Sequence, residues 1–135
     1  MLLESSDKNP VDKYGFTPFH FAAKIGRSDV YQLIIEELKD KNPTTFKTGE
    51  TPLHLAAERG RSDVCRLMID NVENKNPADM CGITPLHYVA NNGQLDVCRL
   101  IIDGIDNKNP SNIYGDASLH WAAQRCRFDV LSYLY

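Results

Sequence analysis

The stretch Thr51-Pro52-Leu53-His54-Leu55-Ala56-Ala57 decides the fold of this chain, because the same heptapeptide pattern occurs four times. The copies begin at residues 17, 51, 84 and 117, so successive copies are 34, 33 and 33 residues apart. A second marker, Lys-Asn-Pro, keeps the same period, with its asparagines at Asn9, Asn42, Asn76 and Asn109. A fixed period of this length indicates a stacked array of supersecondary units. Such an array presents a long, shallow surface, and function is expected there rather than in a closed pocket.

Each period predicts two short helices. The first is expected to start at Thr51-Pro52, because threonine caps free backbone N–H groups and proline suits the first helical turn. The second is expected to begin near Arg61, with apolar residues at i, i+3 and i+4 on one face. These apolar stripes are Val64, Leu67 and Met68, then Val30, Leu33 and Ile34, then Val97, Leu100 and Ile101. Neither helix can bury its apolar face alone, so each unit requires its neighbour.

The segment between Lys-Asn-Pro and the heptapeptide predicts a hairpin-like loop. Proline fixes its own φ and pushes the preceding asparagine to an extended conformation. One glycine occupies the same place in every loop, which predicts a positive φ at Gly15, Gly49, Gly82 and Gly115. The sequence therefore predicts an all-α solenoid of stacked helix-turn-helix units, with hairpin-like loops that project at right angles.

These residues and spacings resemble the ankyrin repeat over essentially the whole chain. The matching pattern is Gly-x-Thr-Pro-Leu-His-x-Ala-Ala-x-x-Gly, followed by Asp-Val-x-x-Leu-Ile. The chain departs from it by using Lys-Asn-Pro where the family more often has Gly-Ala-Asp-Val-Asn, which concerns the turn and not the fold. The resemblance implies one domain over residues 1–135, with repeats at about 9–41, 42–75, 76–108 and 109–135, the last truncated. Residues 1–8 resemble the remnant of a preceding repeat.

Composition argues against several classes of function. A net charge of −3 and a pI near 5.7 argue against a nucleic-acid partner, which usually requires a clustered basic excess. No apolar run approaches the roughly 18 residues of a membrane span, so no membrane partner is expected. The four cysteines form no CxxC pair, which favours a reduced, cytoplasmic compartment without disulfides or zinc. No cofactor is expected.

Four histidines in register are interpreted as structural residues. His20, His54, His87 and His120 each follow a helix-starting position, where an imidazole can bond local backbone and tie successive loops together. Stacked units lie on the order of 10 Å apart, too far for neighbouring imidazoles to share zinc at bonds of about 2.0–2.1 Å. The sequence contains no phosphate loop, nucleophile elbow or pair of catalytic carboxylates. No enzymatic activity is expected.

Residues that vary between the four periods are predicted to bind a partner protein. The resemblance places them at the hairpin tips and along a concave groove, and large apolar residues at such exposed positions are typical of interaction sites. The alternative is that these positions are merely exposed and unconstrained. The predicted binding residues are Lys13, Tyr14, Phe16, Lys24, Ile25, Lys47, Thr48, Glu50, Glu58, Arg59, Met80, Cys81, Ile83, Asn91, Asn92, Ile113, Tyr114, Asp116, Gln124 and Arg125.

The leading functional hypothesis is a protein–protein interaction module without catalysis. Two alternatives stay open: a structural spacer segment of a longer ankyrin array, or the substrate-receptor or targeting arm of a larger enzyme or channel. Weak self-association through the terminal repeats is also expected, because burying an exposed apolar stripe is favourable. That stripe consists of Val130, Leu131, Tyr133, Leu134 and Tyr135.

Overall fold

The computed structural model describes residues 10–37, 40–106, 110–124 and 127–129, which form seven short helices and one isolated β-bridge. The helices are α1 (Pro18–Ile25), α2 (Ser28–Ile35), α3 (Pro52–Glu58), α4 (Ser62–Asn71), α5 (Pro85–Asn92), α6 (Leu95–Asp103) and α7 (Ser118–Gln124). The predicted all-α solenoid is confirmed. In the part of the chain described, no helix has the length and apolar character needed to cross a membrane.

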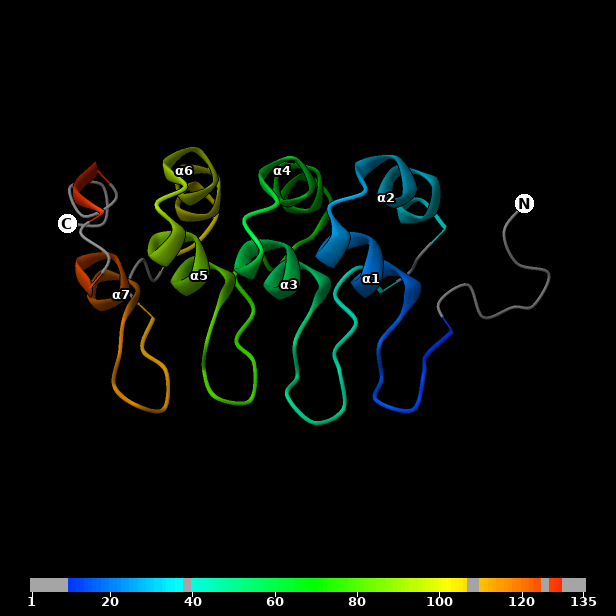
Figure 1. Ribbon diagram of the computed structural model, residues 1–135, viewed down its shortest axis with the longest axis horizontal. Coiled ribbons are helices and arrows are strands. Elements are labelled where there is room, and N and C mark those ends of the chain that lie inside the picture. Colours follow the sequence, from blue (N-terminus) through cyan, green and yellow to red (C-terminus); the bar gives the residue numbers. More distant parts are fainter. Residues whose placement is uncertain (1–9, 38–39, 107–109, 125–126, 130–135) are drawn as a thin grey trace.

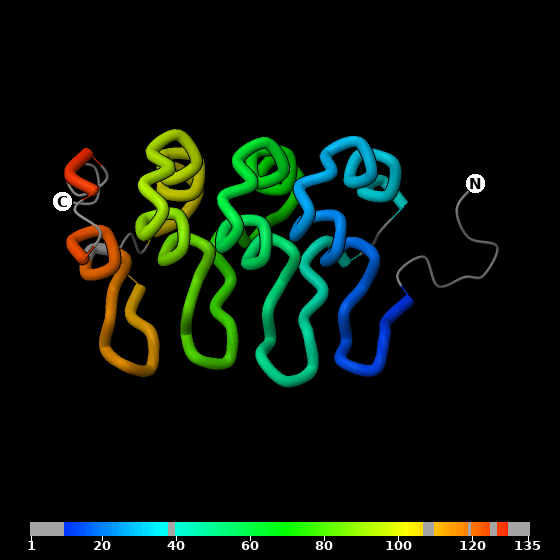
Figure 2. Tube along the Cα trace, in the orientation of Figure 1, coloured from blue at the N-terminus to red at the C-terminus, as the bar shows by residue number. Residues whose placement is uncertain are grey.

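The helices lie in two layers (Figure 1). α1, α3, α5 and α7 pack side by side in one layer, and α2, α4 and α6 form the other. Hairpin loops extend away from the first layer in a single row, as Figure 2 shows along the Cα trace. The repeated sequence therefore produces a repeated surface, with one loop tip for each unit.

Three first-layer helices, α1, α3 and α5, begin as the threonine and proline predict. In α3 the Thr51 Oγ1 accepts the backbone N–H of His54 at 3.3 Å, and Pro52 occupies the first turn. The imidazole completes the exchange, because Nδ1 of His54 accepts the backbone N–H of Thr51 at 3.1 Å. The same reciprocal capping starts α1 and α5. The helix start is thus fixed by three residues of the heptapeptide.

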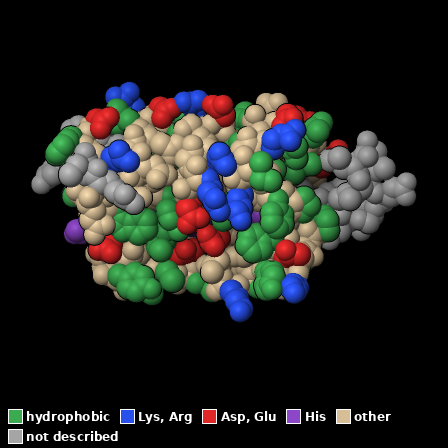
Figure 3. All heavy atoms as spheres, viewed as in Figure 1, with side chains coloured by type: hydrophobic (Ala, Val, Ile, Leu, Met, Phe, Trp, Pro, Cys, Tyr) green, Lys and Arg blue, Asp and Glu red, His purple; other side chains and the backbone are tan. Residues whose placement is uncertain are grey.

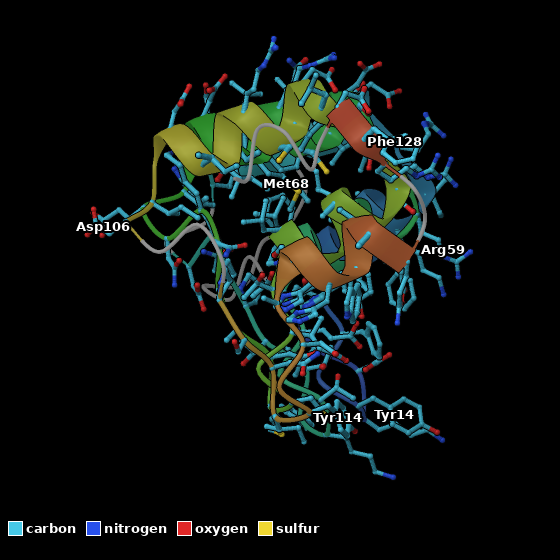
Figure 4. All side chains as sticks on the ribbon, turned by 90° about the vertical axis from the view of Figure 1, so that its left-hand side faces the viewer. Tyr14, Arg59, Met68, Asp106, Tyr114 and Phe128 are labelled. Atoms are coloured by element: carbon cyan, nitrogen blue, oxygen red, sulfur yellow. The ribbon has the colours of Figure 1, made fainter. Side chains whose placement is uncertain are left out.

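The core lies between the two layers, and Met68 marks it in Figure 4. Apolar side chains of both layers are fully buried there, among them Leu53 from α3 and Ile101 from α6. Cys65 and Cys98 are also fully buried, and burial raises the pKa of their thiols to about 12 and about 11. Both cysteines therefore act as small apolar residues rather than reactive thiols.

The apolar stripe predicted for the second helices is wrong for α2 in one residue. Leu33 is 67% exposed, whereas its equivalents Leu67 and Leu100 are partly buried against the core. The buried residues of α2 are Tyr31 and Ile35. α4 and α6 each pack on the second-layer helix of the preceding unit, and no described helix lies on that side of α2.

The Lys-Asn-Pro marker has a structural role, which the third unit shows. The ammonium of Lys75 donates to the carbonyls of Ile69 and Val72 at 2.5 and 3.0 Å, which satisfies acceptors at the end of α4. The side chain of Asn76 accepts the backbone N–H of Leu86 at 2.9 Å, near the start of α5. One tripeptide therefore closes one unit and opens the next.

Candidate functional site

Each hairpin tip is shaped by one polar side chain at its base. In the first, third and fourth loops this residue is Asp12, Asp79 or Asn112, whose Oδ1 accepts the backbone N–H groups two and four residues later at 2.8–3.1 Å. Thr45 takes this place in the second loop and accepts the N–H of Glu50 at 3.1 Å. The four loop glycines have φ between 70° and 87°, which confirms the predicted positive φ.

The second loop is one residue longer than the other three. The N–H of Gly49 bonds the carbonyl four residues earlier, whereas the other loop glycines bond the carbonyl three residues earlier. This insertion accounts for the 34-residue spacing between the first two heptapeptides. If the first two loops are aligned on their glycines, Lys47 is equivalent to Lys13. If they are aligned on the base residues Asp12 and Thr45, Phe46 is equivalent to Lys13. Phe46 is exposed at the tip, and sequence reasoning missed it although the unequal spacing was the signal.

Neighbouring tips are bonded to one another. Backbone N–H groups of Phe46, Met80 and Ile113 donate to carbonyls of the preceding loop at 2.8–2.9 Å. The Phe46 ring also lies against Gly15, where a Cβ would come within 2.7 Å of the ring. A side chain at Gly15 would therefore push Phe46 away. The loops form one continuous frame.

This frame displays a row of large apolar side chains, here called the tip row. Its members are between 50% and 70% exposed. Tyr14 and Tyr114, from the first and last loops, extend on the same side of the molecule as Arg59 (Figure 4). The tip row consists of Tyr14, Phe46, Met80, Ile113 and Tyr114.

Three buried histidines connect the loops to the helices. Nε2 of His20, His54 and His87 donates to the carbonyl of a residue in the next loop at 2.8–3.0 Å. Nδ1 accepts a backbone N–H, so the neutral imidazole has both nitrogens engaged. Burial lowers the pKa of all three below the usual 6.5. This geometry agrees with the structural interpretation of these residues.

The first-layer helices present a face beside the loops, where the resemblance described above predicts a concave groove. The position after each histidine carries a large side chain, and these four residues, Phe21, Leu55, Tyr88 and Trp121, are here called the groove floor. Trp121 meets Tyr88 edge-on, with ring centroids 5.6 Å apart. At the other end of the groove, Phe21 packs on Phe16 at 5.5 Å. Sequence reasoning did not include this position among the predicted binding residues, although its variation among large side chains was a usable signal.

Two carboxylates lie next to the groove floor. The pKa of the Tyr88 hydroxyl is raised by burial and then by the charges of Glu58 and Glu50. Figure 3 shows acidic side chains gathered in the middle of this face, with lysine and arginine side chains above them. Within the described residues, no lysine or arginine forms an ion pair with Glu50 or Glu58.

The predicted binding residues that the structure describes are all exposed or half-buried. Arg125 and the terminal stripe at 130–135 lie outside the described residues. Asn92 joins two units, because its side-chain amide donates to the carbonyl of Ala57 at 2.8 Å. Ile25 lies apart from the tip row and lines an open depression of about 610 Å³ on the flank of α1, together with Val11 and Val30.

Comparison with protein families gives one result for both halves of the chain. The family model for ankyrin repeats, which holds three copies, matches residues 1–79 and again residues 71–135. A comparison with curated proteins finds no match.

Proposed function

The chain belongs to the ankyrin repeat family, whose members generally act as protein–protein interaction modules, and we propose that it binds a partner protein across the tip row and the groove floor. The tip row supplies the apolar contacts in this proposal, and the groove beside it supplies aromatic and charged ones. The family is typically non-catalytic.

The observation that carries the proposal is the exposure of five large apolar side chains on a bonded frame. A protein that can bury Leu53, Met68 and Ile101 completely leaves Tyr114 at 70% exposure on a loop. Contiguous apolar surface of this kind marks interaction sites, and tyrosine is enriched among the residues that dominate binding energy. Because the loops are bonded to one another, little conformational entropy is lost in ordering them on binding.

The chemistry of the site favours binding over catalysis. The imidazoles of His20, His54 and His87 are buried and fully engaged, so they offer no free base to a substrate. Glu50 and Glu58 lie on an open face rather than in a closed pocket, so water is not excluded from them. Aromatic rings and carboxylates on an open face are suited to recognise another protein.

A triple variant tests this proposal. Tyr14→Ser, Met80→Ser and Tyr114→Ser together should reduce affinity capture of the partner by more than about 30-fold, since one hot-spot residue contributes roughly 2 kcal/mol or more. The amount captured is measured by quantitative mass spectrometry from equal inputs. The free energy of unfolding of the variant should change little, because these side chains are exposed.

Leu33→Ser is the matched control. Leu33 is as exposed and apolar as the tip residues, but it lies on α2, in the other helix layer. This variant should capture the partner as well as the unmodified chain does. Undiminished capture by the triple variant, or loss of capture with Leu33→Ser, would contradict the assignment of the tip row as the binding surface.

A further inference from the structure

The middle of the groove combines two aromatic rings with two carboxylates. Tyr88 and Trp121 meet edge to face and are half-buried, so part of each residue remains accessible to solvent. The charges of Glu58 and Glu50 act on the Tyr88 hydroxyl, and Thr48 donates to Oε1 of Glu50 at 3.0 Å. The Thr48 hydroxyl therefore orients the Glu50 carboxylate without neutralising its charge.

From this juxtaposition we infer that the middle of the groove seats an arginine side chain of the partner protein, between Tyr88 and the carboxylates of Glu50 and Glu58. A guanidinium group matches both features, because it donates several parallel hydrogen bonds to carboxylates and stacks on aromatic faces. The inference rests on the proposed function and adds the chemistry of the partner to it.

Charge complementarity decides between this occupant and two others. Within the described residues no lysine or arginine forms an ion pair with either carboxylate, so a guanidinium from the partner would find both available for pairing. A second copy of this chain would bring a net charge of −3 to an acidic patch. A nucleic acid would bring phosphates of the same sign as the patch. A basic protein segment is the occupant that the groove favours.

Selection from random peptides tests the inference and does not require the partner to be identified. Phage-displayed dodecapeptides are selected on the unmodified chain, on the double variant Glu50→Gln with Glu58→Gln, and on Glu73→Gln. The glutamines keep the shape and accepting oxygens of the glutamates. Glu73 is an exposed glutamate just beyond α4, so its replacement makes the same chemical change away from the groove. We expect enrichment of arginine on the unmodified chain and on Glu73→Gln, and no enrichment on the double variant.

A thermodynamic cycle sharpens the result. The best peptide is synthesised with arginine and with citrulline, which is uncharged and of similar shape, and both affinities are measured by calorimetry. Citrulline should weaken binding to the unmodified chain about tenfold or more. On the double variant the two peptides should differ by less than about twofold, because the interacting charges are absent. An equal effect of citrulline on both chains would overturn the inference.

The outcomes also separate this inference from the proposed function. Selected peptides without basic enrichment, whose binding is lost on the tip-row triple variant, would overturn the inference and leave the proposed function supported. Selected peptides that bind the triple variant as tightly as the unmodified chain would contradict the proposed function instead. Selection of no peptide at all would count against both.

Discussion

Equivalent arginines at the junction between the first two units and on the outer flank of the first unit make different contacts. At the junction, Nε of Arg61 donates to the carbonyl of Lys24 in the preceding unit at 3.2 Å. Arg27 occupies the equivalent place on the flank and instead makes two hydrogen bonds to Asp29 of its own helix, at 3.0 and 2.8 Å. Arg127 repeats the junction geometry with the carbonyl of Asn91. The arginine at this repeat position thus bonds the preceding unit where that unit lies beside it, and otherwise bonds an aspartate of its own unit.

Apolar positions show the same difference. Val64 is buried at the junction, and its equivalent Val30 is only half-buried on the flank. Leu55 is 6% exposed, and its equivalent Phe21 is 44% exposed. Burial in this array is therefore a property of a position together with its neighbouring unit. Stability should divide into contributions from each unit and from each junction, and the following experiments measure the junction part.

Acidification should weaken all three histidine junctions at once, and we expect this to be the largest effect. The folded-state pKa of His20, His54 and His87 lies below the unfolded value near 6.5, so the unfolded chain binds more protons. The free energy of unfolding should therefore be fully retained above pH 6.5 and should fall as the pH decreases below it. Urea titrations between pH 5.5 and 7.5 measure this slope. His54→Gln should make the slope shallower, and an unchanged slope would contradict the assignment.

Removing one junction histidine should be costly, and removing the last histidine should not. His54→Ala should lower the free energy of unfolding by about 3 kcal/mol, because it leaves a cavity and unpartnered backbone groups at Thr51 and Ile83. His120 is exposed, so His120→Ala should lower it by about 1 kcal/mol or less. Urea denaturation of both variants makes the comparison. Equal losses would show that the bond to the next loop contributes nothing.

Replacing equivalent leucines with alanine should distinguish the stability contributed by a junction from that contributed by the flank. Leu67→Ala should lower the free energy of unfolding by about 1–2 kcal/mol, because Leu67 packs on the core. Leu33→Ala should change it by less than about 0.5 kcal/mol, because Leu33 is exposed. Thermal and urea unfolding of the two variants measure both changes in stability. A loss at Leu33 as large as that at Leu67 would mean that Leu33 is covered in solution.

The arginine pair should give the smallest difference. Arg61→Ala removes the hydrogen bond to Lys24 and should lower the free energy of unfolding by about 1 kcal/mol. Arg27→Ala removes a fully exposed ion pair with Asp29, so no measurable change is expected. Differential scanning calorimetry of the two variants measures this difference in stability. Reversed sensitivities would remove Arg61 as a coupling residue.

Much of the fold could be predicted because the heptapeptide forms its helix-capping hydrogen bonds within itself. Thr51, Pro52 and His54 set a helix start by bonds within four residues, and such local chemistry is readable from sequence. The role of Lys75 and Asn76 was not predicted, because their partners lie in a helix end and a helix start that only the fold brings together.

The site was predicted less completely, again for physical reasons. Tyr14, Met80 and Tyr114 were found because the repeat pattern places them on exposed loops. Phe46 was missed because one inserted residue shifts the second loop. The roles of Tyr88 and Trp121 depend on what lies beside them across the groove, which periodicity does not encode.

The bonds between successive loops also determine which partners can match this surface. Each tip is held at a set displacement from the next, so a partner must present its anchoring side chains at the same pitch. A partner displaced by one unit would meet Phe46 where Lys13 had been, and the longer second loop would break the match further. If the proposed function holds, the irregularity of one loop within an otherwise regular series therefore selects the alignment of the partner.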